Sequence, residues 1–255
     1  MTTASVAALV LAGRRAPGTD PLELGDVPHK AVLPIHGQAM ISYVVSALDG
    51  AKDINALAIS APPDVQDDLT KVLGDRTFVP AHSSPARSVE AALTQLEADY
   101  ILVTSCDHPL LTADMVNEFL SLGLAAKMDV SVGCVERSVF LARFPTAKRT
   151  FVRLSDFCFS GANLFLFRPS RTRDLLRFWR ALEDKRKQPV AMARQIGLGT
   201  ALRYQVGRLS TAQLLRQIKD KTGARATFIP LDDPLAAIDV DKTSDVELVT
   251  ALLKP

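Results

Sequence analysis

Two parts of the sequence carry side chains that could bind phosphate groups and a divalent metal ion. The first is a long loop that follows the apolar run 7–11 and returns to apolar sequence just after residue 30. Its candidate nucleotide-binding residues, with the end of the apolar run, are Leu11, Ala12, Gly13, Arg14, Arg15 and Lys30. Small residues allow backbone N–H groups to approach phosphate oxygens, and Arg and Lys side chains neutralise phosphate charge. The loop therefore predicts a polyphosphate site, with a solvated surface loop as the alternative.

The second part supplies carboxylates. Asp107 follows the apolar run 100–104, and Asp239 and Asp241 lie at the end of the short segment 237–240. Mg²⁺ takes oxygen ligands, keeps several waters, and is typically bound by one or two carboxylates together with substrate phosphates. Each aspartate alone is more often a turn or cap residue. Together with the first loop, they predict a site for an Mg²⁺-bound nucleotide.

Apolar runs that alternate with amphipathic segments predict the elements that must position these residues. The predicted strands are 7–11, 54–59, 77–79, 100–104, 130–135, 151–154, 163–167, 226–229 and 237–240. The predicted helices are 39–48, 65–74, 89–96, 113–122, 170–182, 210–221 and 244–253, with two short helices before residue 209 that break at Gly197 and Gly199. Capping signals are Thr112, the Ser210–Gln213 and Ser244–Glu247 boxes, and Gly223. Residues 155–162 are predicted to be a loop.

This alternation predicts an α/β fold, with a mostly parallel central sheet and helices on both faces. In such sheets the ligand lies at the carboxyl ends of the strands. The loop containing Gly13 and the residue Asp107 both follow predicted strands. We therefore expect them to face one crevice.

The composition bounds the domain organisation. The 255 residues are 47% hydrophobic and no Pro/Gly/Ser-rich linker divides them, which predicts a single domain over 1–255. The segment from Arg168 to Lys221 holds 14 Lys and Arg against 4 Asp and Glu, a balance of +10 within a chain of net charge +2. We therefore predict a basic, mostly helical insertion at about 168–223. It could contact an anionic partner, although a solvated helix pair is the simpler interpretation.

The sequence also indicates a compartment. Cys106, Cys134 and Cys158 lie far apart, in neither a disulfide pattern nor metal-ligand spacing, which favours a reducing cytoplasm. No apolar run approaches the roughly 20 residues of a membrane span. The residues before the first strand lack a basic flank, so a signal peptide is not expected.

The ordered set of motifs resembles the MobA-like nucleotidyltransferases, which have a glycosyltransferase-A-like (Rossmann-like) nucleotide-binding fold. The motifs are LVLAG, an arginine, Lys30, VTSCDHPLL and AIDVDKTSDVEL, in the family's order over nearly the whole chain. The resemblance implies an Mg²⁺-dependent transfer of a nucleoside monophosphate from an NTP to a phosphorylated small-molecule acceptor, with release of pyrophosphate. It also implies that Lys30, Asp107 and Asp241 are catalytic.

The same resemblance assigns binding roles. It implies that the first loop and Lys30 hold the triphosphate, and that Asp107 and Asp241 hold the metal, with Asp239 as the alternative. PARSVEAAL, closest to the form in cytidylyltransferases, puts Arg87 and Ser88 near the nucleobase and slightly favours CTP over GTP. FSGANLFLF resembles the acceptor-side strand, with Gly161 and Asn163 facing the second substrate.

Two departures from the family pattern stand out. The family commonly has a second glycine and a compact loop, where this chain has two arginines and a longer loop with prolines. The proline after the last metal aspartate is absent. Phosphate affinity could thus depend on guanidinium charge, and the loop could close only on binding.

Other classes fit less well. A nicotinamide dehydrogenase would need G-x-G-x-x-G before an immediate helix, and a glycosyltransferase usually has D-x-D after the central strand. A non-catalytic adaptor could use the basic block on anionic lipid, giving weak peripheral membrane contact. No nucleic-acid motif is present, so no nucleic-acid partner is expected. The acceptor stays open among molybdopterin, a sugar or polyol phosphate, and a phosphorylated lipid headgroup precursor.

Overall fold

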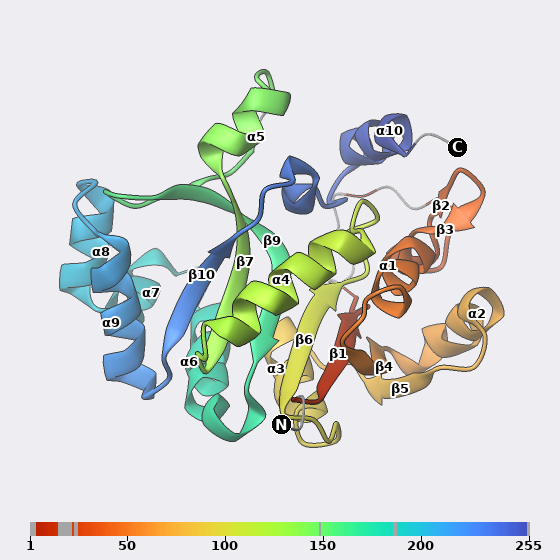
Figure 1. Ribbon diagram of the computed structural model, residues 1–255, viewed down its shortest axis with the longest axis horizontal. Coiled ribbons are helices and arrows are strands. Elements are labelled where there is room, and N and C mark those ends of the chain that lie inside the picture. The colour runs from red at the N-terminus through yellow and green to blue at the C-terminus, as the bar shows by residue number, and fades with distance from the viewer. Residues whose placement is uncertain (1–3, 15–21, 23–24, 148, 186–187, 254–255) are drawn as a thin grey trace.

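The computed structural model describes residues 4–14, 22, 25–147, 149–185 and 188–253. Its centre is an eight-stranded sheet with the order β10-β7-β9-β6-β1-β4-β5, in which β8 pairs with β9 (Figure 1). The strands are β1 (Val6–Leu11), β4 (Ile54–Ala61), β5 (Thr77–Pro80), β6 (Tyr100–Ser105), β7 (Val130–Glu136), β8 (Val152–Arg153), β9 (Cys158–Phe167) and β10 (Ala226–Pro230). A separate hairpin joins β2 (Pro34–Ile35) and β3 (Gln38–Ala39). Pairing is parallel except where β9 is involved, so the predicted mostly parallel sheet is confirmed.

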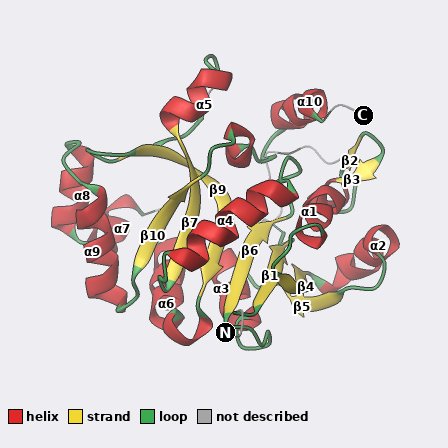
Figure 2. Ribbon diagram, viewed as in Figure 1, coloured by secondary structure: helices red, strands yellow, loops and turns green. Residues whose placement is uncertain are grey.

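Helices cover both faces of this sheet (Figure 2). The α-helices are α1 (Met40–Asp49), α2 (Pro63–Leu73), α3 (Pro85–Ala92), α4 (Ala113–Ala125), α5 (Arg137–Arg143), α6 (Arg173–Glu183), α7 (Pro189–Ile196), α8 (Leu198–Gln205), α9 (Thr211–Thr222) and α10 (Thr243–Leu252). Short 3-10 helices are η1 (Lys30–Val32), η2 (Pro169–Arg171) and η3 (Pro234–Ala237).

Alternation along β1 shows why two layers of helices form. Val6, Ala8 and Val10 enter one core with residues of α1, α2 and α4, whereas Ala7 and Leu9 enter a second core with residues of α3 and α6. Successive side chains of a strand point to opposite faces, so an unbroken apolar run needs cover on both sides. Burying each large aliphatic side chain contributes about 1.5–3 kcal/mol.

The capping predictions have mixed outcomes. Thr112 caps α4, and the Ser210–Gln213 capping box starts α9, which ends at Gly223 in the left-handed conformation. The Ser244–Glu247 box is wrong: α10 starts at Thr243, and Asp245 accepts from the Lys242 backbone N–H. The short helices break at Gly197, as predicted, but Gly199 lies inside α8.

Three predictions about other boundaries are also wrong. No strand forms at 237–240 because Pro234, capped by the Asp233 carboxylate, starts η3 instead. The predicted loop 155–162 is too long, since β9 already begins at Cys158, where it pairs with β8 and then with β7. The helix predicted from residue 170 starts at Arg173, because Pro169 first forms η2.

The helices of the basic segment pack against the same sheet. Helix α6 packs Leu176 and Trp179 into the second core. Leu209 and Leu214, before and within α9, pack with Phe159 and Phe228 in a third cluster, and β10 then adds to the sheet beside β7. None of the described helices is long and apolar enough to cross a membrane.

Candidate functional site

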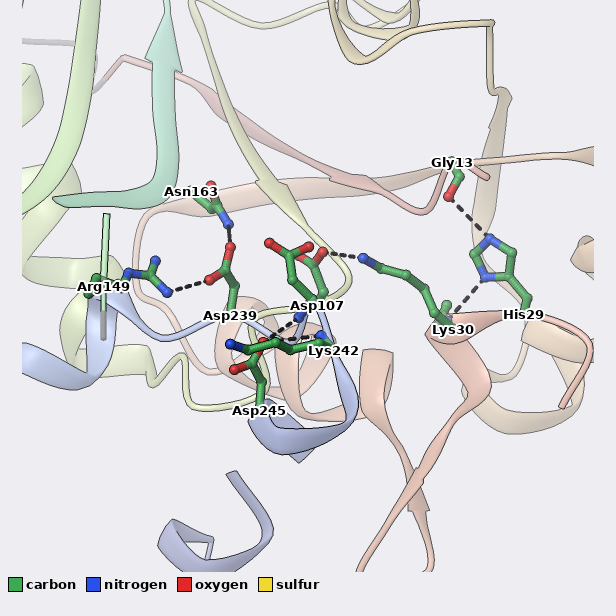
Figure 3. A network of polar contacts seen from close by, with 11 residues as sticks. Gly13, His29, Lys30, Asp107, Arg149, Asn163, Asp239, Lys242 and Asp245 are labelled. Atoms are coloured by element: carbon green, nitrogen blue, oxygen red, sulfur yellow. Dashed lines mark hydrogen bonds and ion pairs between the residues drawn. The ribbon is translucent and has the colours of Figure 1, made fainter. Parts of the chain in front are cut away.

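The carboxyl ends of β1 and β6 bring Lys30 and Asp107 together. Asp107 follows β6 and Lys30 is the first residue of η1, and their side chains form an ion pair (Figure 3). Each side chain is only 12% exposed. Residues 77 positions apart in the chain thus share one partly buried charge pair, at the edge where the sequence predicts the ligand.

The charges around Lys30 keep it protonated. Burial by itself lowers the pKa of Lys30, but the negative charge of Asp107, its hydrogen bond, and the charge of Asp241 raise the pKa above its ordinary value. Lys30 is therefore a cation at neutral pH, and Asp241 lies within electrostatic range of it. A fixed cation beside a carboxylate can exchange that partner for phosphate oxygens.

His29 connects the first loop to Lys30. Its Nε2 donates to the Gly13 carbonyl at 3.2 Å, and its Nδ1 accepts from the Ala31 backbone N–H at 3.1 Å. The side chain is buried, and burial is the largest influence that lowers its pKa, so the ring is neutral. No role for His29 is predicted from the sequence, although its position directly before Lys30 was an available signal. The imidazole fixes Gly13 and Lys30 relative to one another.

The first loop starts as a continuation of the sheet. Ala12 donates to the Ser60 carbonyl of β4, and the Leu11 carbonyl accepts from Cys106 after β6, so the start of the loop is fixed between these two strands. A Cβ added at Gly13 would meet nothing within 4 Å, so open space lies beside this backbone. Arg14 pairs with Asp64 of α2 at 2.8 Å instead of approaching Lys30. Arg15 lies outside the described residues.

Two side chains hold Asp239, one from β9 and one from the segment before β8. Its Oδ1 accepts from Arg149 at 2.7 Å, and its Oδ2 accepts from Asn163 Nδ2 at 3.0 Å. Arg149 also donates to Ser160 Oγ at 2.9 Å. Burial raises the pKa of Asp239, but the Arg149 charge and the two hydrogen bonds outweigh it and keep the pKa below its usual value. The sequence analysis missed Arg149, which no motif marks.

Asn163 reaches Asp239 from a distorted part of β9. Its φ is 50°, in the left-handed region that asparagine tolerates better than most residues. The β7–β9 register shifts there, because Val132 pairs with Phe165 and Cys134 with Gly161. Asn163 thus contacts the aspartate segment, while Gly161 is exposed on the strand.

Asp241 reaches the site through its backbone. The Val240 N–H donates to the Asp107 carbonyl at 2.8 Å, which fixes the segment 239–241 beside the end of β6. The Asp241 N–H donates to the Asp245 carboxylate at 3.0 Å (Figure 3 shows Asp245 below Asp107). Asp239 has a donor on each carboxylate oxygen, and Asp241 lies in the same segment beside the end of β6.

The donor set fits a magnesium ion that shares its shell with substrate. Asp107 Oδ1 is buried and has no hydrogen-bond partner among the described residues. An orphaned carboxylate oxygen is costly unless a ligand completes it. The described residues contain no group of three or more His, Cys, Asp or Glu side chains that could hold a metal by itself. Two carboxylates and substrate phosphates are what Mg²⁺ typically uses.

His108 forms the floor beneath this site. It is 1% exposed, and the backbone of Leu235 lies within hydrogen-bonding reach of its ring. Burial lowers the pKa of His108 and outweighs the nearby charges of Asp239 and Asp107, so the ring is neutral. Thr104 and Ser105 carry buried hydroxyls that find no partner among the residues described. The end of β6 thus holds several unsatisfied polar atoms around Asp107.

The expected nucleobase residues lie two strands away. Ser88 Oγ accepts from the His82 N–H at 2.8 Å, and Arg87 pairs with Asp184 of the segment after α6 at 3.3 Å. Ser60 on β4 joins this loop to the first one, since its carbonyl binds Ala12 and its hydroxyl donates to Pro80. At about 4.8 Å per strand, the two loops are about 10 Å apart.

A comparison with family models identifies the chain's relatives. The model described as a MobA-like NTP transferase domain matches residues 8–233. A molybdenum cofactor guanylyltransferase from Shewanella sp. (strain W3-18-1) is 29% identical over 156 residues, covering 57% of this chain and 72% of the relative. A protein of the same name from Shewanella frigidimarina (strain NCIMB 400) is 31% identical over 131 residues, covering 49% and 60%.

Solved structures give the same fold. A hypothetical transferase from Thermus thermophilus superposes with a TM-score of 0.80 at 29% identity, over 95% of this chain and 99% of that one. CMP:2-keto-3-deoxy-manno-octonic acid synthetase, solved with CTP, has a TM-score of 0.61 at 16% identity, with 98% of each chain covered. The similarity to this second structure shows the fold alone, which is the predicted glycosyltransferase-A-like α/β class.

Proposed function

Because the chain belongs to the family of MobA-like NTP transferase domains and is a nucleotidyltransferase, we propose that it transfers a nucleoside monophosphate from an NTP to a phosphorylated small molecule. The observation that carries the proposal is the meeting of three distant segments. Lys30 pairs with Asp107, and Val240 binds the Asp107 backbone next to Asp241. A cation, a carboxylate with a buried free oxygen, and a second carboxylate suit the triphosphate of a metal-bound nucleotide.

We assign the metal to Mg²⁺, with Asp107 and Asp241 as its protein ligands. When bound, the ion neutralises charge on the phosphates and so favours displacement at the α-phosphorus. Asp239 would act indirectly, by holding the side chains of Asn163 and Arg149 in place. When the nucleotide binds, Lys30 would move from Asp107 to the phosphates. Lys30 would then pair with phosphate oxygens, and Asp107 with the metal ion.

The transfer needs no protein nucleophile. A phosphate monoester has its second pKa near ~6, so it is mostly dianionic at neutral pH. One acceptor oxygen forms a bond to the α-phosphorus of the NTP, and the bond from that phosphorus to the bridging oxygen breaks. Pyrophosphate leaves with the bonding electron pair. Alignment and charge stabilisation by Lys30, the loop at Gly13 and the bound ion supply the catalysis.

The identity of the nucleotide is a choice between GTP and CTP. The sequence slightly favours CTP, from the segment that carries Arg87 and Ser88. The name of the Shewanella relatives favours GTP and, as acceptor, molybdenum cofactor. We propose that the base lies between the loop at Gly13 and the loop at Ser88, where the ends of β1, β4 and β5 adjoin. Gly161 and Asn163 would border the acceptor.

The test is pyrophosphate release with each NTP and a panel of phosphorylated acceptors. The panel includes molybdopterin, sugar and polyol phosphates, and phosphorylated lipid headgroup precursors. We expect release with one NTP and one acceptor class, dependent on Mg²⁺ and absent with EDTA. Release of pyrophosphate from no pair, with protein shown to be folded, would contradict the proposal.

We also propose that 1–255 is one domain in which about 168–223 is an insertion that makes weak contact with anionic membranes. Apolar side chains on α7 and α8, including Val190, Leu198 and Leu202, are exposed near Arg194 and Arg203. Basic residues near such a surface contribute about 1 kcal/mol each. Charge reversal at Arg194 and Arg203 should abolish sedimentation with anionic vesicles. All three cysteines are free, which fits a cytoplasmic site of action.

A further inference from the structure

A second cavity lies at the opposite end of the sheet from Asp107. It has a volume of about 500 Å³ and is formed where β9 ends, where β7 and β10 begin, and where α6 and α9 meet. Strand β6 has six residues, so at about 3.3 Å per residue the two ends are about 20 Å apart. In Figure 1 the starts of β6 and β10 lie at the bottom of the sheet. We call this cavity the basic groove; its cations are Arg168, Arg171, Arg173, Lys219 and Arg225.

The floor of the basic groove is fixed by Asp129. This residue is 6% exposed, and its carboxylate accepts from the backbone N–H of Arg225 at 2.8 Å and from Arg225 Nε at 3.3 Å. Its carbonyl accepts from the Arg168 N–H at 2.9 Å. The strand ends that carry Arg168 and Arg225 are therefore held together by one buried residue, Asp129, which binds the first through its carbonyl and the second through its carboxylate. The groove is built on the rigid sheet and not on a loose surface loop.

The carboxylates near the groove are already engaged. Asp129 pairs with Arg225, and Asp174 pairs with Arg177, outside the groove, at 3.1 Å. Asp99, whose pKa the Arg168 charge helps to lower, accepts from the backbone and hydroxyl of Ser5. Within the described chain, Arg168, Arg171, Arg173 and Lys219 have no ion-pair partner. Four neighbouring cations that form no ion pair repel one another, and a multivalent anion would relieve that repulsion.

The start of α6 adds backbone donors. Its N-cap residue, Thr172, makes no capping hydrogen bond, because its hydroxyl donates to the Arg168 carbonyl at 3.1 Å. The first N–H groups of this 11-residue helix are thus left without a side-chain cap beside Arg171 and Arg173. Helix N-termini and arginine forks both favour phosphate oxygens.

We propose that the basic groove is a binding site for a small molecule with two or more phosphate groups, separate from the catalytic site. The cavity volume lies in the range of small-ligand sites, and the four unpaired cations match the charge of a polyphosphate better than that of a single phosphate. The source is either a free polyphosphate or the diphosphate headgroup of a lipid. Neither the metal site nor the acceptor site is part of this proposal.

The experiment is calorimetric titration of the full chain with inorganic pyrophosphate, in EDTA. The groove variant is Arg171→Gln/Arg173→Gln, and the matched control is Arg208→Gln/Arg216→Gln, which removes the same charge from exposed positions of the basic segment outside the groove. The Lys30→Met variant removes the cation of the catalytic site. We expect binding to persist in Lys30→Met and in the control, and to weaken about tenfold to hundredfold in the groove variant.

The other results overturn the proposal. Loss of binding only in Lys30→Met would place the anion at the catalytic site, and equal loss in the groove and control variants would show a general charge effect. Absence of pyrophosphate binding together with no groove-dependent vesicle binding would also overturn it. In the vesicle arm, phosphatidylcholine vesicles with and without diacylglycerol pyrophosphate are sedimented with each variant. Binding that requires both diacylglycerol pyrophosphate and Arg171 with Arg173 would support the site and identify a lipid headgroup as the source.

Discussion

The two ends of the sheet hold their charges in opposite ways. Where β6 ends, Lys30 pairs with Asp107 and Arg149 pairs with Asp239, and none of the four side chains is more than 22% exposed. Each pair joins segments more than 70 residues apart in the sequence. The same two ion pairs therefore set the geometry of the site and hold distant segments of the chain together.

At the other end, the basic groove holds exposed arginines and a lysine that lack carboxylate partners in the described chain. Removing a buried partner leaves a charge uncompensated, whereas removing an exposed and unpaired one changes little in the fold. Stability and function should therefore be coupled at the first end of the sheet and separate at the second. Four predictions test this difference.

The largest effect is expected from Asp107→Asn. Turnover should fall about 100-fold to 1000-fold, because Asp107, which is both the proposed metal ligand and the partner of Lys30, loses its charge. Leaving Lys30 with a weaker partner should also destabilise the fold by about 1–3 kcal/mol. Initial rates at saturating Mg²⁺ and thermal melting measure both.

The control is Asp68→Asn, which removes an ion pair with Lys71 on the surface of α2. It should change neither rate nor melting temperature. Wild-type turnover in folded Asp107→Asn would show that this carboxylate is not part of the catalytic site.

The next effect is expected from Lys30→Met. NTP affinity and the transfer rate should fall together by about 100-fold, because the charge is lost from the ground state and the transition state alike. Equilibrium binding of the NTP and single-turnover rates separate the two contributions. If affinity and rate both stay at the wild-type level, Lys30 only neutralises Asp107.

A smaller effect, with a pH signature, is expected from Arg149→Met. In the wild type the pKa of Asp239 is below its ordinary value of 3.8, so its stabilising contribution is present above that value and is lost as pH falls through the folded pKa. Without Arg149, burial raises this pKa, so the ionised form becomes destabilising. The loss of melting temperature should therefore be small well below pH 3.8 and grow as the pH rises through and above that value.

Arg76→Met is the matched control for Arg149→Met. It breaks a more exposed pair with Asp49, so its effect should not vary in this way with pH. A pH-independent difference between Arg149→Met and the wild type would mean that Arg149 only packs beside Asp239.

The smallest effect on activity is expected from Arg171→Gln/Arg173→Gln. Melting temperature and transfer rate should stay close to those of the wild type, because these side chains pair with no carboxylate that the structure describes. Rates without added polyphosphate, and thermal melting, measure this. A large loss of either would end the contrast between the two ends of the sheet.

Local patterns in the sequence were enough to predict the fold class and most elements. The apolar runs at 7–11 and 100–104 became the central strands because such runs must be covered on both faces. Thr112, Ser210 and Gly223 fixed helix ends through contacts within a few residues. The predicted site residues Lys30 and Asp107 lie together because parallel strands end at one edge.

Only the tertiary structure decided the partners. Arg149 and His29 belong to no motif, and each acts through residues supplied by other segments, Asp239 and Gly13. The segment 237–240 has a strand-like composition, yet Pro234 starts a 3-10 helix that includes Ala237, and the bond from Val240 to Asp107 fixes the residues that follow. Likewise, the charge balance of +10 in the basic segment does not indicate which of its cations lie together in the folded chain. Periodicity and capping depend on near neighbours in the chain, whereas charge pairing depends on distances that exist only after the sheet has formed.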